Sequence, residues 1–154
     1  MRGEETRQVH LFSYISLDER VPKSHPLRKL RLVVDGILAS MNDEFDRAYA
    51  KVGRPSIPPE RLLRALLLQV LFSVRSERML VEQLEYNLLF RWFVGLQIDD
   101  RIFDATAFSH NRERILSERF ARDFFDRVRS LAQWRKLASD EHFTVDGSLI
   151  EAWA

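Results

Sequence analysis

One carboxylate near the C-terminal end, Asp146, is the residue best placed in the sequence to do chemistry. It closes an alternating run rich in β-forming residues, 142–146, which predicts a strand. A carboxylate held rigidly at a strand end suits Mg²⁺, a hard octahedral ion that takes one or two protein carboxylates and keeps its waters. The competing interpretation is a tight turn, because Asp-Gly is the dipeptide most typical of hairpins. A second carboxylate, Glu151, follows, but the sequence does not fix its position relative to Asp146.

A dense polar run lies farther toward the N-terminus and has the residue types that read DNA. Its members are Ser109, His110, Asn111, Arg112 and Arg114. Arginine contacts guanine or phosphate, asparagine pairs with adenine, and serine binds phosphate. The same run also fits a solvated helix start with pairs between Glu113 and nearby arginines.

Two further groups of basic residues suit phosphate binding. On a helix predicted over residues 118–137, Arg119, Arg122, Arg129 and Lys136 form a stripe at about 140° from the apolar face. Any solvated helix has this geometry too, so the stripe alone does not decide the function. Arg75 and Arg78, at the predicted turn before another helix, form an alternative reading surface.

Composition bounds the class of protein. The chain has 154 residues, 45% hydrophobic and 31% charged, which is enough for one folded domain or for one domain plus part of the next. Cysteine is absent, so disulfides and thiolate metal sites are excluded. The N-terminal residues lack the apolar core of a signal peptide, and the apolar runs are too short to span a bilayer. We therefore expect a cytoplasmic protein with no membrane role.

Charge is distributed unevenly behind a net value of +1. Residues 101–136 contain nine basic and five acidic residues, a net +4, whereas residues 137–154 contain four acidic and no basic residues, a net −4. This asymmetry favours a polyanion-binding segment followed by a cation-binding one.

The elements that must position these residues are mostly helices. Residues 1–24 lack a sustained period and predict a flexible arm. Apolar spacing of three and four predicts helices at about residues 25–48, 59–74, 77–92, 107–116 and 118–137, the last two of which could be continuous. Ser24 is the predicted cap of the first helix, and Asp104 or Thr106 that of the fourth. The short turn near Arg75 indicates an αα-hairpin or a helix-turn-helix, with a plain helical bundle as the alternative.

Several stretches together resemble transposases of bacterial insertion sequences that begin with the transposase InsH N-terminal domain. The matching runs are RPSIPPE at 54–60 with LLRALLLQ at 62–69, RSER at 75–78, QLEYNLLFRWFVGL at 83–96, Phe108-Ser109 with Asn111-Arg112 and Arg114, and VDGSLIEA at 145–152. They extend over nearly all of the chain beyond about residue 20.

The resemblance implies a DDE enzyme, in which an RNase H-like α/β domain holds two Mg²⁺ ions with three carboxylates for attack on a phosphodiester. Asp146 matches the first of the three, as catalytic residue and metal ligand. The implied architecture is mainly α: a helical, helix-turn-helix-like DNA-binding domain over residues 25–137, then the first strand of a truncated RNase H-like domain over residues 138–154.

Three departures from the family pattern qualify this expectation. The family usually has Ser-Thr where this chain has Thr106-Ala107, and Lys where it has His110, which removes a charge from a presumed DNA-facing segment. The sequence ends eight residues after Asp146, without the other two carboxylates. We therefore expect this chain to be catalytically inactive and to bind no Mg²⁺ by itself.

The resulting prediction is a module that binds double-stranded DNA at an element's terminal inverted repeats. The predicted contacts are Arg75, Arg78, Ser109, Asn111, Arg112, Arg114, Arg119, Arg122 and Arg129. One alternative is an oligomerisation module that pairs with itself or with full-length transposase, favoured by any exposed leucine or tryptophan on the helix at 77–92. Another is a decayed reading frame without a function.

Overall fold

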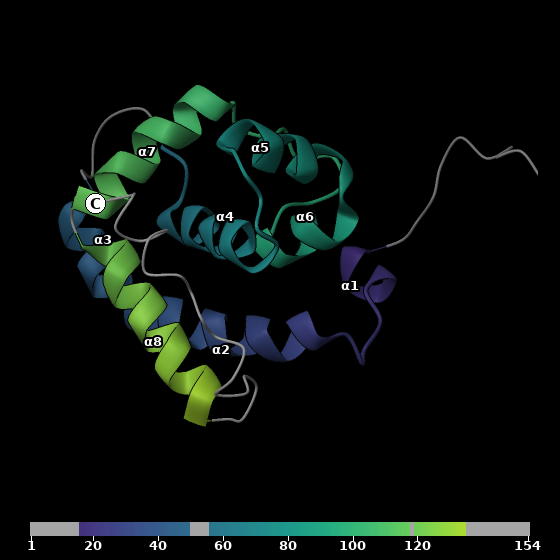
Figure 1. Ribbon diagram of the computed structural model, residues 1–154, viewed down its shortest axis with the longest axis horizontal. Helices are drawn as coiled ribbons and strands as arrows, with labels where there is room; N and C mark the ends of the chain where they lie inside the picture. The colour runs from purple at the N-terminus through teal and green to yellow at the C-terminus, as the bar shows by residue number, and fades with distance from the viewer. Residues whose placement is uncertain (1–15, 50–55, 118, 135–154) are drawn as a thin grey trace, which may run out of the picture.

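Helices make up the regular structure throughout the part of the chain that the computed structural model describes, which is residues 16–49, 56–117 and 119–134 (Figure 1). They are α1 Leu17–Arg20, α2 Pro26–Ser40, α3 Asn42–Ala48, α4 Pro59–Leu71, α5 Glu77–Tyr86, α6 Leu88–Val94, α7 Ala105–Ser117 and α8 Phe120–Trp134. No strand occurs among these residues, so the prediction of a mainly α chain is confirmed there. The strand at 142–146, with Asp146, lies outside the described residues.

The central helix is α4, which packs against α6, α7 and α8 (Figure 1). Pro59 occupies its first turn, where proline's missing N–H costs no hydrogen bond. The helix ends at Leu71, three residues earlier than predicted. Ser73 takes a left-handed conformation (φ 49°), and the N–H groups of Ser73 and Val74 donate to the carbonyls of Val70 and Gln69, the pattern of a Schellman cap.

Two helices predicted as continuous are each broken by a local feature. Asn87 separates α5 from α6, and its side chain accepts hydrogen bonds from the N–H groups of Leu89 (3.0 Å) and Phe90 (3.3 Å). Met41 separates α2 from α3. The predicted cap of α2 was also wrong: His25, not Ser24, accepts from the N–H of Leu27.

The N-terminal segment is more ordered than predicted. Within the expected arm, residues 17–20 form α1. Ser16 and Glu19 cap the N-terminus of this helix with a capping box. Leu17 is buried, and α1 packs against α6. The arm prediction therefore does not hold for residues 17–20.

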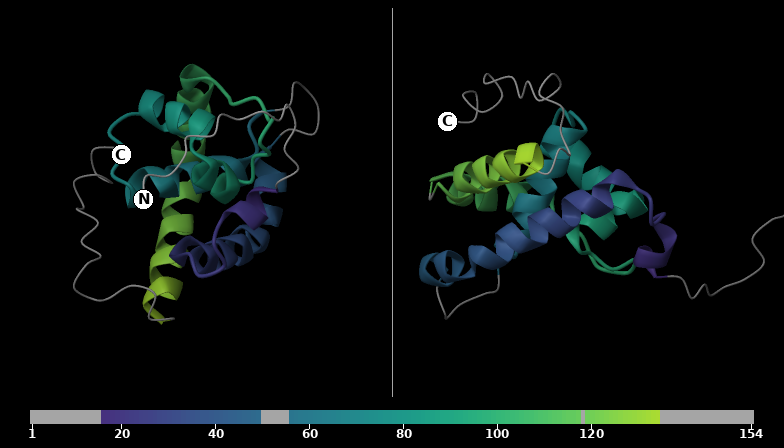
Figure 2. Two further views of the ribbon diagram at one scale, coloured as in Figure 1. Left: turned by 90° about the vertical axis from the view of Figure 1, so that its right-hand side faces the viewer. Right: turned by 90° about the horizontal axis from the view of Figure 1, so that it is seen from below.

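The last two helices carry most of the predicted contact residues. Asp104 caps α7 by accepting from the N–H of Ala107 at 2.7 Å, as one of the two predicted caps. Helix α7 ends at Ser117 and α8 begins at Phe120, and Arg119, just before α8, has a φ of 63°. Helix α8 packs against α2, and the left view of Figure 2 shows the two helices crossing at an angle. Within the described ranges, no helix has the length and apolar character needed to cross a membrane.

Candidate nucleic-acid interface

The start of α5 presents two exposed arginines, Arg75 and Arg78. Ser76 caps the helix between them, accepting from the N–H of Met79 at 3.2 Å. Neither guanidinium forms an ion pair within the described residues. A helix N-terminus carries a partial positive charge and unsatisfied N–H groups, so two adjacent cations there favour a phosphate.

Helix α7 brings the predicted polar run to the same place. The Ser109 hydroxyl donates to the Glu77 carboxylate, and Arg112 forms an ion pair with that carboxylate. The side chains of Arg112 and Glu77 are only 24% and 16% exposed. The two surfaces that the sequence offered as alternatives are therefore neighbours in the fold, joined through Glu77. We call this set, Arg75, Glu77, Arg78, Ser109 and Arg112, the α5–α7 face.

Glu77 changes what Arg112 does. An unpaired carboxylate in the first turn of α5 would repel a phosphate held by Arg75 and Arg78. Arg112 and Ser109 neutralise and hydrogen-bond this carboxylate, so Glu77 does not oppose the positive charge of Arg75 and Arg78. Arg112 thus acts in the folded chain as an ion-pair partner rather than as an outstretched phosphate ligand.

The other members of the polar run differ in their surroundings. The Asn111 side-chain amide donates to the carbonyl of Ala107 at 2.7 Å, within its own helix. His110 is exposed beside it. The side chain of Arg114 lies outside the described residues, so its predicted contact stays a prediction.

Of the predicted basic stripe, Arg122 and Arg129 are exposed on α8, whereas Arg119 is exposed just before the helix begins. Arg129 has a loose pairing with Asp126, at 3.6 Å, in which both side chains are about 60% exposed. Opposite the stripe, Phe124 and Val128 are buried, as the apolar spacing predicted. The loop before α7 adds Arg101, an exposed cation that the sequence reasoning passed over.

Another group of arginines is used by the fold itself. Arg28 and Arg31 lie over the ring of Trp92, with their guanidinium carbons 5.1 and 4.5 Å from its centroid. The Trp92 indole N–H donates to Asp18 at 3.0 Å, and Arg28 also donates to Asp18 at 3.0 Å. We call Asp18, Arg28, Arg31 and Trp92 the Trp92 junction, because they join α1, α2 and α6.

Electrostatics at this junction follow from these contacts. The hydrogen bonds from Trp92 and then Arg28 lower the pKa of the Asp18 carboxyl below its ordinary value. Burial lowers the pKa of the Arg31 guanidinium, against the attraction of Asp35. Asp35 also binds Arg64 at 2.7 Å, which extends the network to α4.

Arg91 is the one buried arginine among the described residues, at 3% exposure, and sequence reasoning missed it. Its guanidinium donates to the carbonyls of Leu84 (3.0 Å), Gln97 (3.0 and 2.5 Å) and Asp100 (2.6 Å). These bonds tie the end of α5 to the loop after α6, so Arg91 is structural.

No candidate metal site occurs among the described residues. Across residues 16–49, 56–117 and 119–134, no three histidine, aspartate or glutamate side chains gather where they could hold an ion. Asp146, the predicted catalytic residue and ligand, lies outside those ranges. Any Mg²⁺ site stays an expectation tied to that residue.

Comparison with known proteins adds one finding. Residues 15–114 match a family described as Transposase domain (DUF772). The match covers α1 to most of α7, including the α5–α7 face and the Trp92 junction. No curated protein and no solved structure matches the chain.

Proposed function

The chain belongs to the DUF772 transposase-domain family, and we propose that it is the DNA-binding part of an insertion-sequence transposase, recognising the terminal inverted repeats of its element. The observation that carries the proposal is the α5–α7 face. Two exposed arginines flank the capped start of α5, while the nearby carboxylate is neutralised from α7.

Each basic group has a part in this proposal. Arg75 and Arg78 bind backbone phosphate at the start of α5, and Arg112 keeps Glu77 from opposing them. Arg119, Arg122 and Arg129 supply a second line of phosphate contacts along α8. Asn111 remains the proposed base reader: one amide N–H donates to the Ala107 carbonyl, so reading a base requires its Oδ1 and second N–H, whereas the single hydroxyl proton of Ser109 goes to Glu77.

A catalytic role is proposed only from the resemblance to transposases, and not from any described residue. An intact transposase of the resembled type cuts and joins strands with Mg²⁺ held by three carboxylates, of which Asp146 would be the first.

The alternative of an interaction module through the helix at 77–92 has less support. Leu80, Leu84 and Trp92, whose exposure would have favoured that alternative, are buried in the core. Exposed apolar residues at this helix are limited, among those described, to Met79 and Tyr86.

Fluorescence anisotropy tests the proposal. The chain is titrated into labelled duplexes of about 30 base pairs, some from the DNA flanking its coding sequence and one scrambled, over a salt series. We expect tighter binding to a flanking duplex and a steep loss of affinity with salt. Equal affinity for all duplexes would refute repeat recognition, and no binding at moderate salt would refute DNA binding altogether.

A further inference from the structure

The outer side of α5 carries exposed side chains that packing within the fold does not explain. Met79 is 43% exposed and Tyr86 is 79% exposed, whereas Leu80 and Leu84, on the other side of the helix, are fully buried. Glu82 is exposed as well. Figure 1 shows α5 near the edge of the molecule. We call this set, Arg78, Met79, Glu82 and Tyr86, the outer α5 face.

Helical spacing makes these side chains neighbours. Glu82 follows Arg78 by four residues and Met79 by three, and residues three or four apart lie next to one another on a helix surface. Although Arg78 and Glu82 have opposite charges at this spacing, they do not form an ion pair with each other or with another described residue. Both charged groups are therefore available to a ligand.

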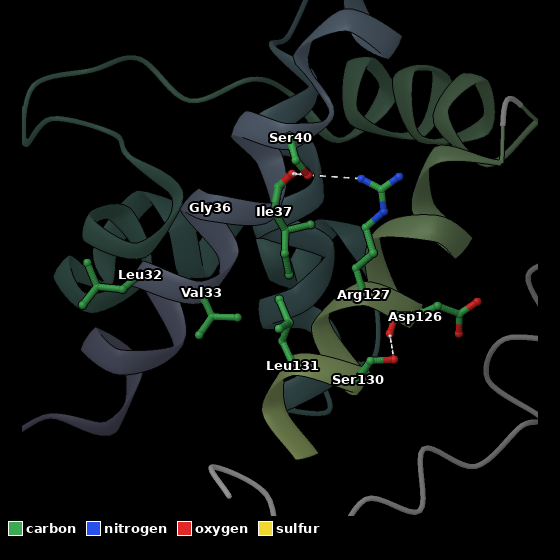
Figure 3. Close-up of a pocket in the computed structure, with 9 residues that line it drawn as sticks. All are labelled: Leu32, Val33, Gly36, Ile37, Ser40, Asp126, Arg127, Ser130 and Leu131. Carbon is green, nitrogen blue, oxygen red and sulfur yellow. Dashed lines mark hydrogen bonds between the residues drawn. The ribbon is translucent and has the colours of Figure 1, made fainter. Parts of the chain in front are cut away.

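Many other arginines of the described fold are not available in this way. Arg127, for example, lines the groove between α2 and α8, where it hydrogen-bonds to Ser40 at 3.2 Å (Figure 3) and pairs with Glu44 at 3.2 Å. Arg75 and Arg78 instead place two exposed cations beside the outer α5 face. Charge complementarity therefore favours a polyanion as the occupant of this face, and we take double-stranded DNA.

The charges along α5 determine which end of the helix approaches DNA. Arg75 and Arg78 lie at its N-terminal end, whereas Glu85 lies in its last turn. Phosphates therefore attract the first half of the helix and repel the second. Seven helical residues, 77–83, are about 10 Å long, which fits a major groove about 12 Å wide.

Building on the proposed function, we propose that the first half of α5 enters the major groove and that Met79 and Glu82 read base edges there. The Glu82 carboxylate accepts a hydrogen bond from the N4 amino group of cytosine, and Met79 contacts the C5-methyl group of thymine. A carboxylate at this position repels phosphate, so it weakens binding to any sequence that does not offer it this donor. Glu82 thus determines specificity, while Arg75 and Arg78 contribute affinity.

Selection of bound duplexes from a library with about 20 randomised base pairs, using the full chain, tests the role of Glu82. We expect a preferred site that contains a required cytosine. Glu82→Gln should reduce discrimination at that position about tenfold and bind scrambled duplex more tightly than wild type, because a repulsive charge is removed. The matched control is Glu85→Gln, which removes the same charge from the second half of α5 and should select the wild-type site.

A second measurement pairs a change in Met79 with a change in the DNA. Replacing a contacted thymine of the selected site by uracil removes only the methyl group and should weaken binding of the wild type about fourfold. Met79→Ala should bind the thymine and uracil duplexes equally, because the methyl group has lost its partner. Both side chains are exposed, so each variant should melt within about 3 °C of wild type, which excludes misfolding as the cause.

The outcomes separate this inference from the proposed function. If the wild type bound no duplex or selected no site, the proposed function would be refuted and the inference with it. A selected site that Glu82→Gln reads unchanged, and in which every thymine tolerates uracil, would overturn the inference alone. Loss of base preference in Asn111→Ala but not in Glu82→Gln or Met79→Ala would also overturn it and assign base reading to α7.

Discussion

The Trp92 junction and the α5–α7 face are both built on arginine, but they use it in opposite ways. At the junction, Arg28 and Arg31 lie on an indole ring and donate to backbone and carboxylate oxygens. At the α5–α7 face, Arg75 and Arg78 extend into solvent from the start of a helix. The difference indicates which arginines hold the fold and which are available to a ligand.

Arg112 stands between these two uses and shows why exposure alone is an incomplete guide. It lies on the face proposed for DNA, yet its partly buried guanidinium pairs with Glu77. The comparison therefore predicts large stability losses at the buried arginine and near the junction, intermediate losses at Arg112, and none at the exposed pair.

The largest expected effect comes from Arg91, the extreme case of an arginine used by the fold. Arg91→Met keeps most of the side-chain length but leaves the carbonyls of Leu84, Gln97 and Asp100 without this donor. We expect the free energy of unfolding to fall by about 3 to 5 kcal/mol. Urea denaturation followed by circular dichroism measures it, and a loss below about 1 kcal/mol would contradict the structural role.

Trp92 should give the next largest effect. Trp92→Phe retains an aromatic ring but removes the N–H that donates to Asp18 and weakens the interaction with Arg28 and Arg31. We expect a loss of about 1 to 3 kcal/mol in unfolding free energy by the same measurement. Arg28→Ala in the Trp92→Phe background should then cost less than in wild type, and strict additivity would argue against a coupled junction.

Arg112→Ala should lower stability by about 1 to 2 kcal/mol, because it leaves the Glu77 carboxylate partly buried without its cation. The matched variant Glu77→Gln/Arg112→Ala removes both charges and should recover part of the loss. If Arg112→Ala left stability unchanged and only weakened DNA binding, Arg112 would be a direct phosphate ligand instead.

The pH dependence of the junction follows from the lowered pKa of Asp18. A carboxylate whose pKa is lower in the folded state than its ordinary 3.8 stabilises the fold above that pH, and this contribution is lost as pH falls through the folded-state pKa. Asp18→Asn should therefore be less stable than wild type at neutral pH. Urea midpoints measured down to about pH 2 should show this gap closing below about pH 4; a constant gap would contradict the assignment.

Exposed arginines should have the smallest effect on stability. Arg75→Ala/Arg78→Ala should change the free energy of unfolding by no more than about 0.5 kcal/mol, because neither side chain contacts a charged partner in the described fold. A larger loss in urea denaturation would show that the start of α5 depends on them.

Apolar spacing predicted well where helices lie along the chain. It did not predict the points at which a helix is interrupted while the apolar spacing carries on unchanged. Leu80, Leu84, Leu88 and Trp92 recur every four residues on both sides of Asn87, so their spacing could not reveal the cap that divides α5 from α6. Apolar spacing did place Leu80, Leu84 and Trp92 in the core.

The sequence indicated which residue types form the site, but not which side chains contact one another there. The sequence indicated Arg75, Arg78 and Arg112 as DNA contacts, but Glu77 reaches Arg112 only after α5 and α7 pack together. Arg91 was hidden for the same reason, because its acceptors are backbone carbonyls that converge only in the folded chain. Asp146 lies beyond the described residues, and its role stays a prediction.

The most direct test of the comparison is the salt dependence of DNA binding for two double variants of equal charge. Arg75→Ala/Arg78→Ala removes two exposed arginines of the α5–α7 face, and Arg20→Ala/Lys23→Ala removes two exposed cations near α1. We predict that the first lowers the slope of log K against log salt by about 2, while the second leaves it nearly unchanged. Equal slopes and affinities for the two variants would contradict a phosphate-binding role for the start of α5.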